Sequence, residues 1–226
     1  MDCTDCKNCT FKSEAAKKLR EIDLMRLAAN STQVRFTKGE TIIREGALSS
    51  NIIYLREGLV KIHLKGPVRE QIVKITKAPT FLGVPTAIGD RINHYSVTAI
   101  EPCDVCFIDE KTFATLLSNN GAFAYEIALL MSRNELVNYH NCVNRTQKML
   151  RGRLAEAILF LGKEIYASKK YTMPLSRAEL ADWLDATRES VSRVLSEFHE
   201  QKIIKLTTKS VEILDEQKLE FISKNG

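Results

Sequence analysis

Short apolar and β-branched runs, separated by turn-forming residues, fill the chain between residues 33 and 109. We expect a strand in each run, at 34–36, 41–43, 51–55, 59–64, 71–75, 95–100 and 105–108. Six of the ten glycines and four of the five prolines fall between residues 39 and 102, where they can form the turns of a compact all-β unit. The pattern predicts a small barrel or roll.

Beyond residue 109, apolar residues recur every three or four positions, which predicts one long helix over 121–147. Its narrow apolar seam consists of Phe123, Ile127, Leu130, Asn134 and Val137. Such a seam suits a partner helix, and a polar residue such as Asn134 tends to fix the register of the pair at a cost in stability. We therefore predict a parallel, rather weak dimer through these residues. The alternative is a helix that packs only on its own domain.

Residues 175–198 have the pattern of two short helices joined by a tight turn. Ser176 and Glu179 stand three residues apart, as in a capping box that satisfies two backbone amides at a helix start. Thr187 can cap the second helix. The apolar side chains of that helix recur at i, i+3, i+4 and i+7, and they are Val191, Val194, Leu195 and Phe198. A hairpin at 202–206 and 211–214 would complete a winged helix-turn-helix.

The opposite face of the second helix carries side chains that can read base pairs. Arginine matches the two acceptors of guanine, glutamate accepts from the cytosine amino group, and a recognition helix places its first two turns in the major groove. Lys209, in the turn of the wing, can contact phosphate. The residues that we assign to DNA contact are Ser176, Arg177, Thr187, Arg188, Glu189, Ser192, Arg193 and Lys209. The competing interpretation is a solvated charged face.

The composition is compatible with DNA binding and argues against a membrane protein. The 226 residues include 33 basic and 28 acidic side chains, and neither half of the chain is strongly basic. No apolar run approaches the roughly 18 residues that cross a bilayer, and the first ten residues lack the pattern of a secretory signal. We expect a cytoplasmic protein whose six cysteines are metal ligands, redox groups or buried side chains rather than disulfides.

These motifs together resemble the CRP/FNR family of bacterial transcription regulators. The best matched stretches are 175–182 and 187–195, and the segments 36–40, 54–60 and 81–83 resemble the β-roll sensor domain of that family. The resemblance implies an α+β protein with an N-terminal β-roll (jelly-roll) of the cyclic-nucleotide-binding type, a long dimerisation helix and a C-terminal winged helix-turn-helix. The expected domains are a cysteine-containing leader (1–22), the β-roll (23–120), the dimerisation helix (121–147) and the DNA-binding domain (148–226).

The function that the resemblance implies is sequence-specific regulation of transcription, not enzymatic catalysis. It implies a homodimer that binds a palindromic promoter site and works with RNA polymerase. The spacing of Glu189, Ser192 and Arg193 is similar to that of FNR-type recognition helices, which implies a TTGAT-like half-site. One departure is Asp185, since family members usually have glycine in this turn; aspartate tolerates the left-handed conformation.

Cyclic AMP does not fit the sequence of the β-roll. Family members that bind cyclic nucleotides place a Gly-Glu-Leu segment and an Arg-Ser pair around the phosphate, because the anion needs a positive charge and backbone donors. The corresponding residues here are Val84 and Pro85, and then Asn93 and His94. We therefore expect a signal other than cyclic AMP.

The cysteines indicate a redox or gas signal. Cys3, Cys6 and Cys9 form a C-x-x-C-x-x-C leader, and the resemblance aligns Cys106 with the internal cluster ligand of FNR-type oxygen sensors. These four residues could hold a [4Fe-4S] cluster. FNR-type leaders have a longer gap before the third cysteine, so zinc, a thiol–disulfide switch or no metal remain alternatives. We expect Cys103 and Cys142 to be buried packing residues.

Other classes of function remain open beside this interpretation. Heme or a small ligand other than cyclic AMP could control the same DNA-binding regulator, and a metal-free β-roll could act as a scaffold or regulatory protein. Metal-dependent catalysis on a β-roll needs several histidines with a carboxylate, whereas only His63 and His94 lie there. We therefore expect no enzyme.

Overall fold

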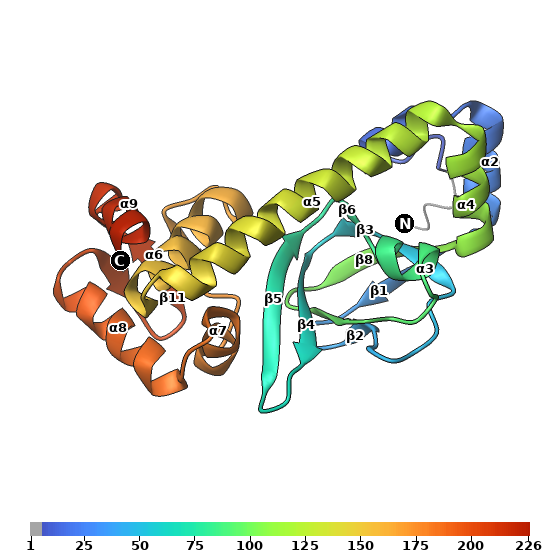
Figure 1. Cartoon of the computed structure of the whole chain (residues 1–226). Helices are drawn as coiled ribbons and strands as arrows, with labels where there is room; N and C mark the ends of the chain where they lie inside the picture. The colour runs from blue at the N-terminus through green and yellow to red at the C-terminus, as the bar shows by residue number, and fades with distance from the viewer. Residues whose placement is uncertain (1–5) are drawn as a thin grey trace. The chain divides into compact units, whose positions relative to one another are not determined.

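The computed structural model describes residues 6–226 as two compact units (Figure 1). The N-terminal unit contains the chain up to Lys65 together with Val73–Leu136. The C-terminal unit contains Gly66–Ile72 and Val137–Gly226. The first unit carries the expected β-roll and the second the expected helix-turn-helix. None of the helices in the described part of the chain is long and apolar enough to cross a membrane.

Two four-stranded antiparallel sheets form the roll. The first has the order β1 (Ser31–Phe36), β8 (Cys103–Asp109), β3 (Asn51–Glu57) and β6 (Thr80–Leu82). The second has the order β2 (Thr41–Ile43), β7 (Ser96–Ala99), β4 (Leu59–Lys65) and β5 (Glu70–Lys77). All seven predicted strands are present. The additional strand, β6, is only three residues long, which makes it too short to show a sequence period.

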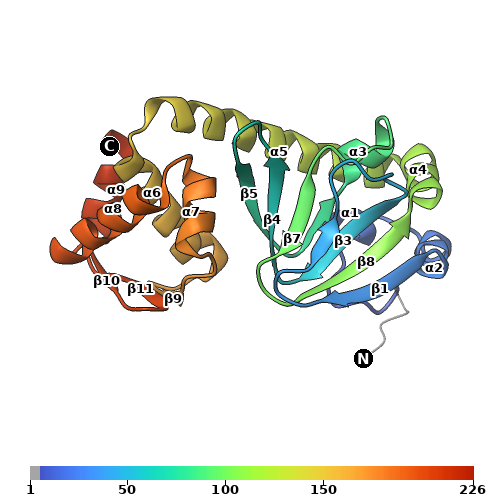
Figure 2. The ribbon, with the colours of Figure 1, turned by 90° about the horizontal axis from the view of Figure 1, so that it is seen from below.

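Strand β3 is buried on both faces, which explains its continuous apolar run. Ile53 and Leu55 point into the roll, where they pack against residues of the second sheet such as Val97. Ile52 and Tyr54 point the other way, because side chains alternate along a strand. They pack against helices α2 (Glu21–Ala29), α4 (Glu110–Asn119) and the start of α5 (Gly121–Gln147). Figure 2 shows α2 and α4 beside the first sheet.

Residues that precede α2 also contribute to the core of the N-terminal unit. Ala15, in the short helix α1 (Glu14–Lys17), and Leu19 are buried in the same core as Tyr54. Helix α3 (Val84–Ile88) follows β6 and also packs on β3.

Helix α5 uses most of the predicted pairing seam within its own unit. Phe123 and Ile127 are only 1% and 4% exposed, and Leu130 packs against the same core. Asn134 accepts a hydrogen bond from Lys74 Nζ at 2.7 Å. Among the five predicted dimerisation residues, only Val137 is exposed. Periodicity identified the helix, but this face packs on the chain's own core.

The C-terminal unit begins with α6 (Leu150–Phe160), which continues into one turn of π-helix, η1 (Leu161–Ile165). Helices α7 (Arg177–Leu184) and α8 (Arg188–Glu200) follow. Strands β10 (Ile204–Leu206), β11 (Ser210–Ile213) and β9 (Lys170–Thr172) then form one antiparallel sheet. The predicted wing is therefore present, and it has the additional strand β9. The chain ends in α9 (Glu216–Asn225), which packs on α6.

Candidate nucleic-acid interface

A reciprocal capping box starts α7, as the sequence predicts. Ser176 Oγ accepts a hydrogen bond from the backbone amide of Glu179 at 3.2 Å, and the Glu179 carboxylate accepts from the amide of Ser176 at 2.9 Å. The pair satisfies two amides that have no partner inside the helix. The inner face of α7 is buried through Leu180, Ala181 and Leu184. The helix is thereby fixed at its start and along its inner face.

The turn between α7 and α8 depends on Asp185. This residue ends α7 in the left-handed conformation, with φ 51° and ψ 56°. Thr187 then caps α8, since its Oγ1 accepts from the amide of Ser190 at 3.2 Å. The four predicted apolar residues of α8, from Val191 to Phe198, are fully buried. Burial of this face leaves the opposite face of α8 to solvent.

Three of the predicted base-reading side chains lie together on the outer face of α8. Arg188, Glu189 and Arg193 are exposed, and Ser192 beside them is half-buried. Arg193 Nη1 donates to Glu197 Oε1 at 2.8 Å, and Arg151 holds the same carboxylate at 2.6 Å. The Arg193 guanidinium is thus held along the helix and must leave Glu197 to contact a base.

The remaining predicted residues have different surroundings. The hydroxyls of Ser176 and Thr187 already serve as helix caps. Arg177 is half-buried, and this burial lowers the pKa of its guanidinium. Lys209 is exposed in the turn between β10 and β11, and its carbonyl accepts from the amide of Met173 at 2.9 Å. Arg188, Glu189, Arg193 and Lys209 are therefore the exposed members of the eight whose side chains do not cap a helix.

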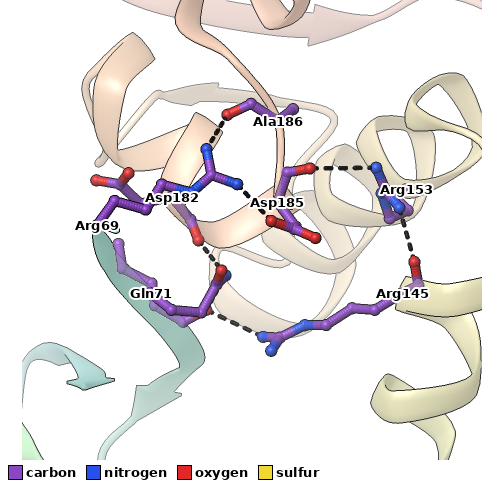
Figure 3. Close-up of polar contacts among 8 residues, drawn as sticks. Arg69, Gln71, Arg145, Arg153, Asp182, Asp185 and Ala186 are labelled. Atoms are coloured by element: carbon purple, nitrogen blue, oxygen red, sulfur yellow. Dashed lines mark hydrogen bonds and ion pairs between the residues drawn. The ribbon is translucent and has the colours of Figure 1, made fainter. Parts of the chain in front are cut away.

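Sequence reasoning missed a group of side chains that contact the turn (Figure 3). Arg69 donates to the Ala186 carbonyl and forms an ion pair with Asp185. Gln71 donates to the Asp182 carbonyl, and Arg153 Nη2 reaches the Asp185 carbonyl at 3.4 Å. Arg69 and Asp185 are 116 positions apart, so no local pattern could have identified their pairing.

The structure also brings the described cysteines of the predicted cluster to one side of β3. Cys106 stands opposite Tyr54 in the β3–β8 ladder, and Cys6 and Cys106 pack against the same core. Burial raises the pKa of Tyr54, and the nearby thiols of Cys9 and Cys106 raise it further. No three potential ligands within residues 6–226 are arranged to hold a metal ion. Cys3 lies outside the described residues.

A buried arginine lies in the same region. Arg56 is only 8% exposed, and its guanidinium lies 5.2 Å from the ring centre of Phe11, whose carbonyl accepts from the Tyr54 hydroxyl at 2.5 Å. Arg56 Nε and Nη1 are buried without a hydrogen-bond partner in the described structure. Buried donors without a hydrogen-bond partner are costly. Cys6, Cys106 and this cation therefore lie in the same region of the N-terminal unit.

The two other cysteines have opposite environments. Cys103 is buried, as predicted, and its Sγ lies 3.1 Å from the Glu101 carbonyl oxygen. Burial raises the pKa of its thiol to about 11. Cys142 is exposed on α5, so the prediction that it is buried is wrong.

In the β-roll, the residues at the cyclic-nucleotide positions serve the fold. Val84 is buried, and buried Asn93 lies within 3.4 Å of the Thr86 hydroxyl, which donates to the Gly83 carbonyl. His94 pairs with Asp90 at 2.7 Å. None of these four side chains is an arginine that could bind a cyclic phosphate.

Comparisons with known proteins agree with this architecture. Residues 152–222 match the model of the Crp-like helix-turn-helix domain, and residues 33–120 match that of the cyclic nucleotide-binding domain. The nitrogen fixation regulation protein FixK of Bradyrhizobium diazoefficiens is 26% identical over 96% of this chain and 93% of its own length. The transcriptional activator protein FnrA of Stutzerimonas stutzeri is 22% identical over 79% of this chain and 75% of its own.

The fold is also that of solved regulators. The structure of FixK2 from Bradyrhizobium japonicum superposes with a TM-score of 0.76 at 19% identity, and covers 85% of this chain and 96% of that one. The c-di-GMP responsive regulator CLP from Xanthomonas campestris gives a TM-score of 0.75 at 18% identity, with 86% and 99% coverage. With its roll, long helix and winged helix-turn-helix, the chain belongs to the CRP/FNR family of DNA-binding transcription regulators.

Proposed function

We propose that this regulator reads a palindromic promoter site with TTGAT-like half-sites through α8. The observation that carries the proposal is the exposed face of the capped helix, where Arg188, Glu189 and Arg193 lie together. In a bound state, Arg193 exchanges its contact with Glu197 for the two acceptors of guanine, and Glu189 accepts from a cytosine amino group. The positive end of the α8 dipole and Lys209 favour the adjacent phosphates.

Fluorescence anisotropy with a duplex of two inverted TTGAT half-sites, beside a scrambled duplex, tests this readout. Arg193→Ala should abolish the preference for the palindrome, because it removes a contact to a base edge. Lys209→Ala should weaken both duplexes alike, because phosphate is common to them. Equal losses on both duplexes for Arg193→Ala would contradict direct readout, and a wild type without any preference would contradict the proposed half-site.

The working form in this proposal is a parallel dimer through a second seam of α5. Its positions follow alternating steps of four and three residues, and they are Tyr125, Leu129, Ser132, Leu136, Tyr139 and Val143. Tyr125 and Leu136 are 64% and 60% exposed, whereas Phe123 and Ile127 are buried in their own unit. Four of the six are large exposed side chains of the kind that a two-stranded coiled coil buries, namely Tyr125, Leu136, Tyr139 and Val143. Two copies would present two recognition helices to the two half-sites.

The proposed signal is redox or gas chemistry at a [4Fe-4S] cluster held by Cys3, Cys6, Cys9 and Cys106. When bound, such a cluster supplies redox-active iron. Within the chain, Cys106 is a fixed ligand on β8, and the leader cysteines would tie the N-terminal segment to that strand. Arg56 would supply the positive charge and the donors that the anionic group requires. Loss of the cluster would remove the link between the leader cysteines and Cys106.

Iron and acid-labile sulfide, measured in protein purified without oxygen, test the cluster. We expect about four of each per chain in the wild type and in Cys142→Ser, and a strong loss in Cys106→Ser. Cys142 is a suitable control because it is exposed on a different element. Air should then remove the iron and weaken DNA binding. Iron-free wild type that still binds the palindrome would refute the cluster and favour control of the regulator by heme or a small ligand. A dimer without sequence-specific DNA binding would instead favour a scaffold or regulatory protein.

A further inference from the structure

Part of the DNA-binding unit comes from a distant hairpin of the chain. The turn after β4 and the first residues of β5 form a tip, Gly66–Ile72, that belongs to the C-terminal unit. Arg69 and Gln71 on this tip reach the end of α7 and the turn that leads into α8 (Figure 3). Arg145 Nη2 donates to the Ile72 carbonyl at 3.0 Å and holds the other end of the tip. The matched helix-turn-helix domain, residues 152–222, contains neither the tip nor Arg145.

The guanidinium of Arg69 contacts both residues of the turn. Its Nη1 donates to the Ala186 carbonyl at 2.6 Å, and its Nη2 binds the Asp185 carboxylate. A guanidinium presents its donors in a rigid fork, so these two contacts together fix the direction of the turn. Ala186 immediately precedes Thr187, the cap of α8. The orientation of the recognition helix is therefore connected to the side chain of Arg69.

Gln71 acts one turn earlier. Its side-chain amide donates to the carbonyl of Asp182, in the last turn of α7. The last four carbonyls of a helix accept no hydrogen bond from within the helix, so a donor from outside stabilises the helix end. Arg153, on α6, adds a donor at the Asp185 carbonyl and at the Arg145 carbonyl. The end of α7 is thus held from two sides.

We propose that Arg69 is a positioning residue for DNA recognition, which orients α8 and neutralises the carboxylate of Asp185. That carboxylate lies one residue before the cap of the recognition helix, where an unpaired negative charge would repel DNA phosphate. In this role Arg69 acts through Asp185 and Ala186, and Gln71 supports it at Asp182. The inference rests on DNA binding by α8 and is independent of the signal.

A double-mutant cycle on the full chain tests the proposal, with the palindromic and scrambled duplexes as probes. Arg69→Ala should weaken binding to the palindrome about tenfold, and Asp185→Gly should change it about twofold or less. On the Asp185→Gly background, Arg69→Ala should lose part of its effect, because no carboxylate then needs a partner while the contact with the Ala186 carbonyl remains. Val68→Ala, at a highly exposed neighbour on the tip, is the matched control and should leave affinity unchanged.

Two further measurements distinguish positioning from other roles. A direct contact of Arg69 with phosphate would give the same loss on both backgrounds and lower the salt slope of binding by about one; this result would overturn the proposal. So would unchanged or tighter binding by Arg69→Ala. Arg69→Lys keeps the positive charge but cannot make both contacts of the guanidinium. Its affinity for the palindrome should therefore lie between that of Arg69→Ala and that of the wild type. Failure of the wild type to prefer the palindrome would refute the proposed half-site, whereas the cycle can still be measured on either duplex.

Discussion

Replacement of Leu136 by aspartate tests which face of α5 pairs in the dimer. Leu136 lies in the middle of the exposed seam and is 60% exposed, so a partner helix has a large apolar surface to cover there. Its neighbour Val137 points about 100° away around the helix. Val137 belongs to the other seam, of which Phe123 and Ile127 are already buried. Aspartate at 136 and aspartate at 137 therefore separate the two seams.

The magnitude follows from the exposed part of the leucine. Full burial of a leucine side chain contributes about 2 kcal/mol, so covering the exposed 60% contributes about 1.2 kcal/mol per copy. Since a two-fold interface buries the residue twice, the loss is about 2.5 kcal/mol per dimer. That energy raises the dimer Kd about 70-fold. Two facing aspartates repel one another, which makes this value a lower bound.

Sedimentation velocity over a range of protein concentrations measures the Kd, with circular dichroism as the control for folding. We expect Leu136→Asp to shift the dimer Kd by about 70-fold or more and Val137→Asp to shift it by about threefold at most. Equal effects of the two variants, or a Leu136→Asp dimer as stable as wild type, would show that the exposed seam does not pair. A wild type that stays monomeric at every concentration and on the palindromic duplex would refute the dimer itself.

Three other predictions concern local chemistry. At pH 8 an alkylating reagent should modify exposed Cys142 quickly and buried Cys103 very slowly. Burial raises the pKa of the Cys103 thiol to about 11, which leaves about one Cys103 thiol in a thousand ionised at pH 8. The rate of Cys103 modification should rise toward pH 11, and equal rates for the two cysteines at pH 8 would contradict the burial of Cys103. Ser176→Ala should lower the unfolding free energy of the C-terminal unit by about 1 kcal/mol in urea titrations, and an unchanged midpoint would argue against the cap. If the cluster is present, Arg56→Gln should retain severalfold less iron than the wild type, as measured by elemental analysis. The control Arg35→Gln, at an exposed arginine, should retain as much iron as the wild type. Equal iron in both variants would exclude Arg56 from the site.

The helix-turn-helix was predictable because its determinants are local. The capping pair Ser176 and Glu179 acts across three residues, and the apolar spacing of α8 selects its buried face without any distant contact. The strands were predictable for a similar reason, since turns and β-branched runs alternate over a few residues. Strand β3 depends on contacts that its own sequence does not contain. A continuous apolar run indicates burial on both faces, but it does not identify the helices that cover Ile52 and Tyr54.

The sequence cannot choose between two possible pairing faces of α5, because the helix carries two sets of positions with the same spacing. Periodicity is equal for the set that contains Phe123 and Ile127 and for the set that contains Tyr125 and Leu136. Only the tertiary structure shows that the first set fills the core beside Phe113, at ring distances such as 5.4 Å between Phe113 and Phe123. The hydrophobic effect has no direction, so a seam does not specify its partner.

Asp185 illustrates how a departure from a family pattern can be compensated elsewhere in the chain. A residue with a Cβ costs about 1 kcal/mol or more in the left-handed region, and a carboxylate adds negative charge where DNA must approach. Arg69 offsets both effects, since one fork binds the carboxylate and the carbonyl of Ala186. Glycine at 185 would remove the carboxylate contact and leave the contact with the Ala186 carbonyl. Arg69 should therefore contribute more to DNA binding while Asp185 is present, so the two positions have to be interpreted together.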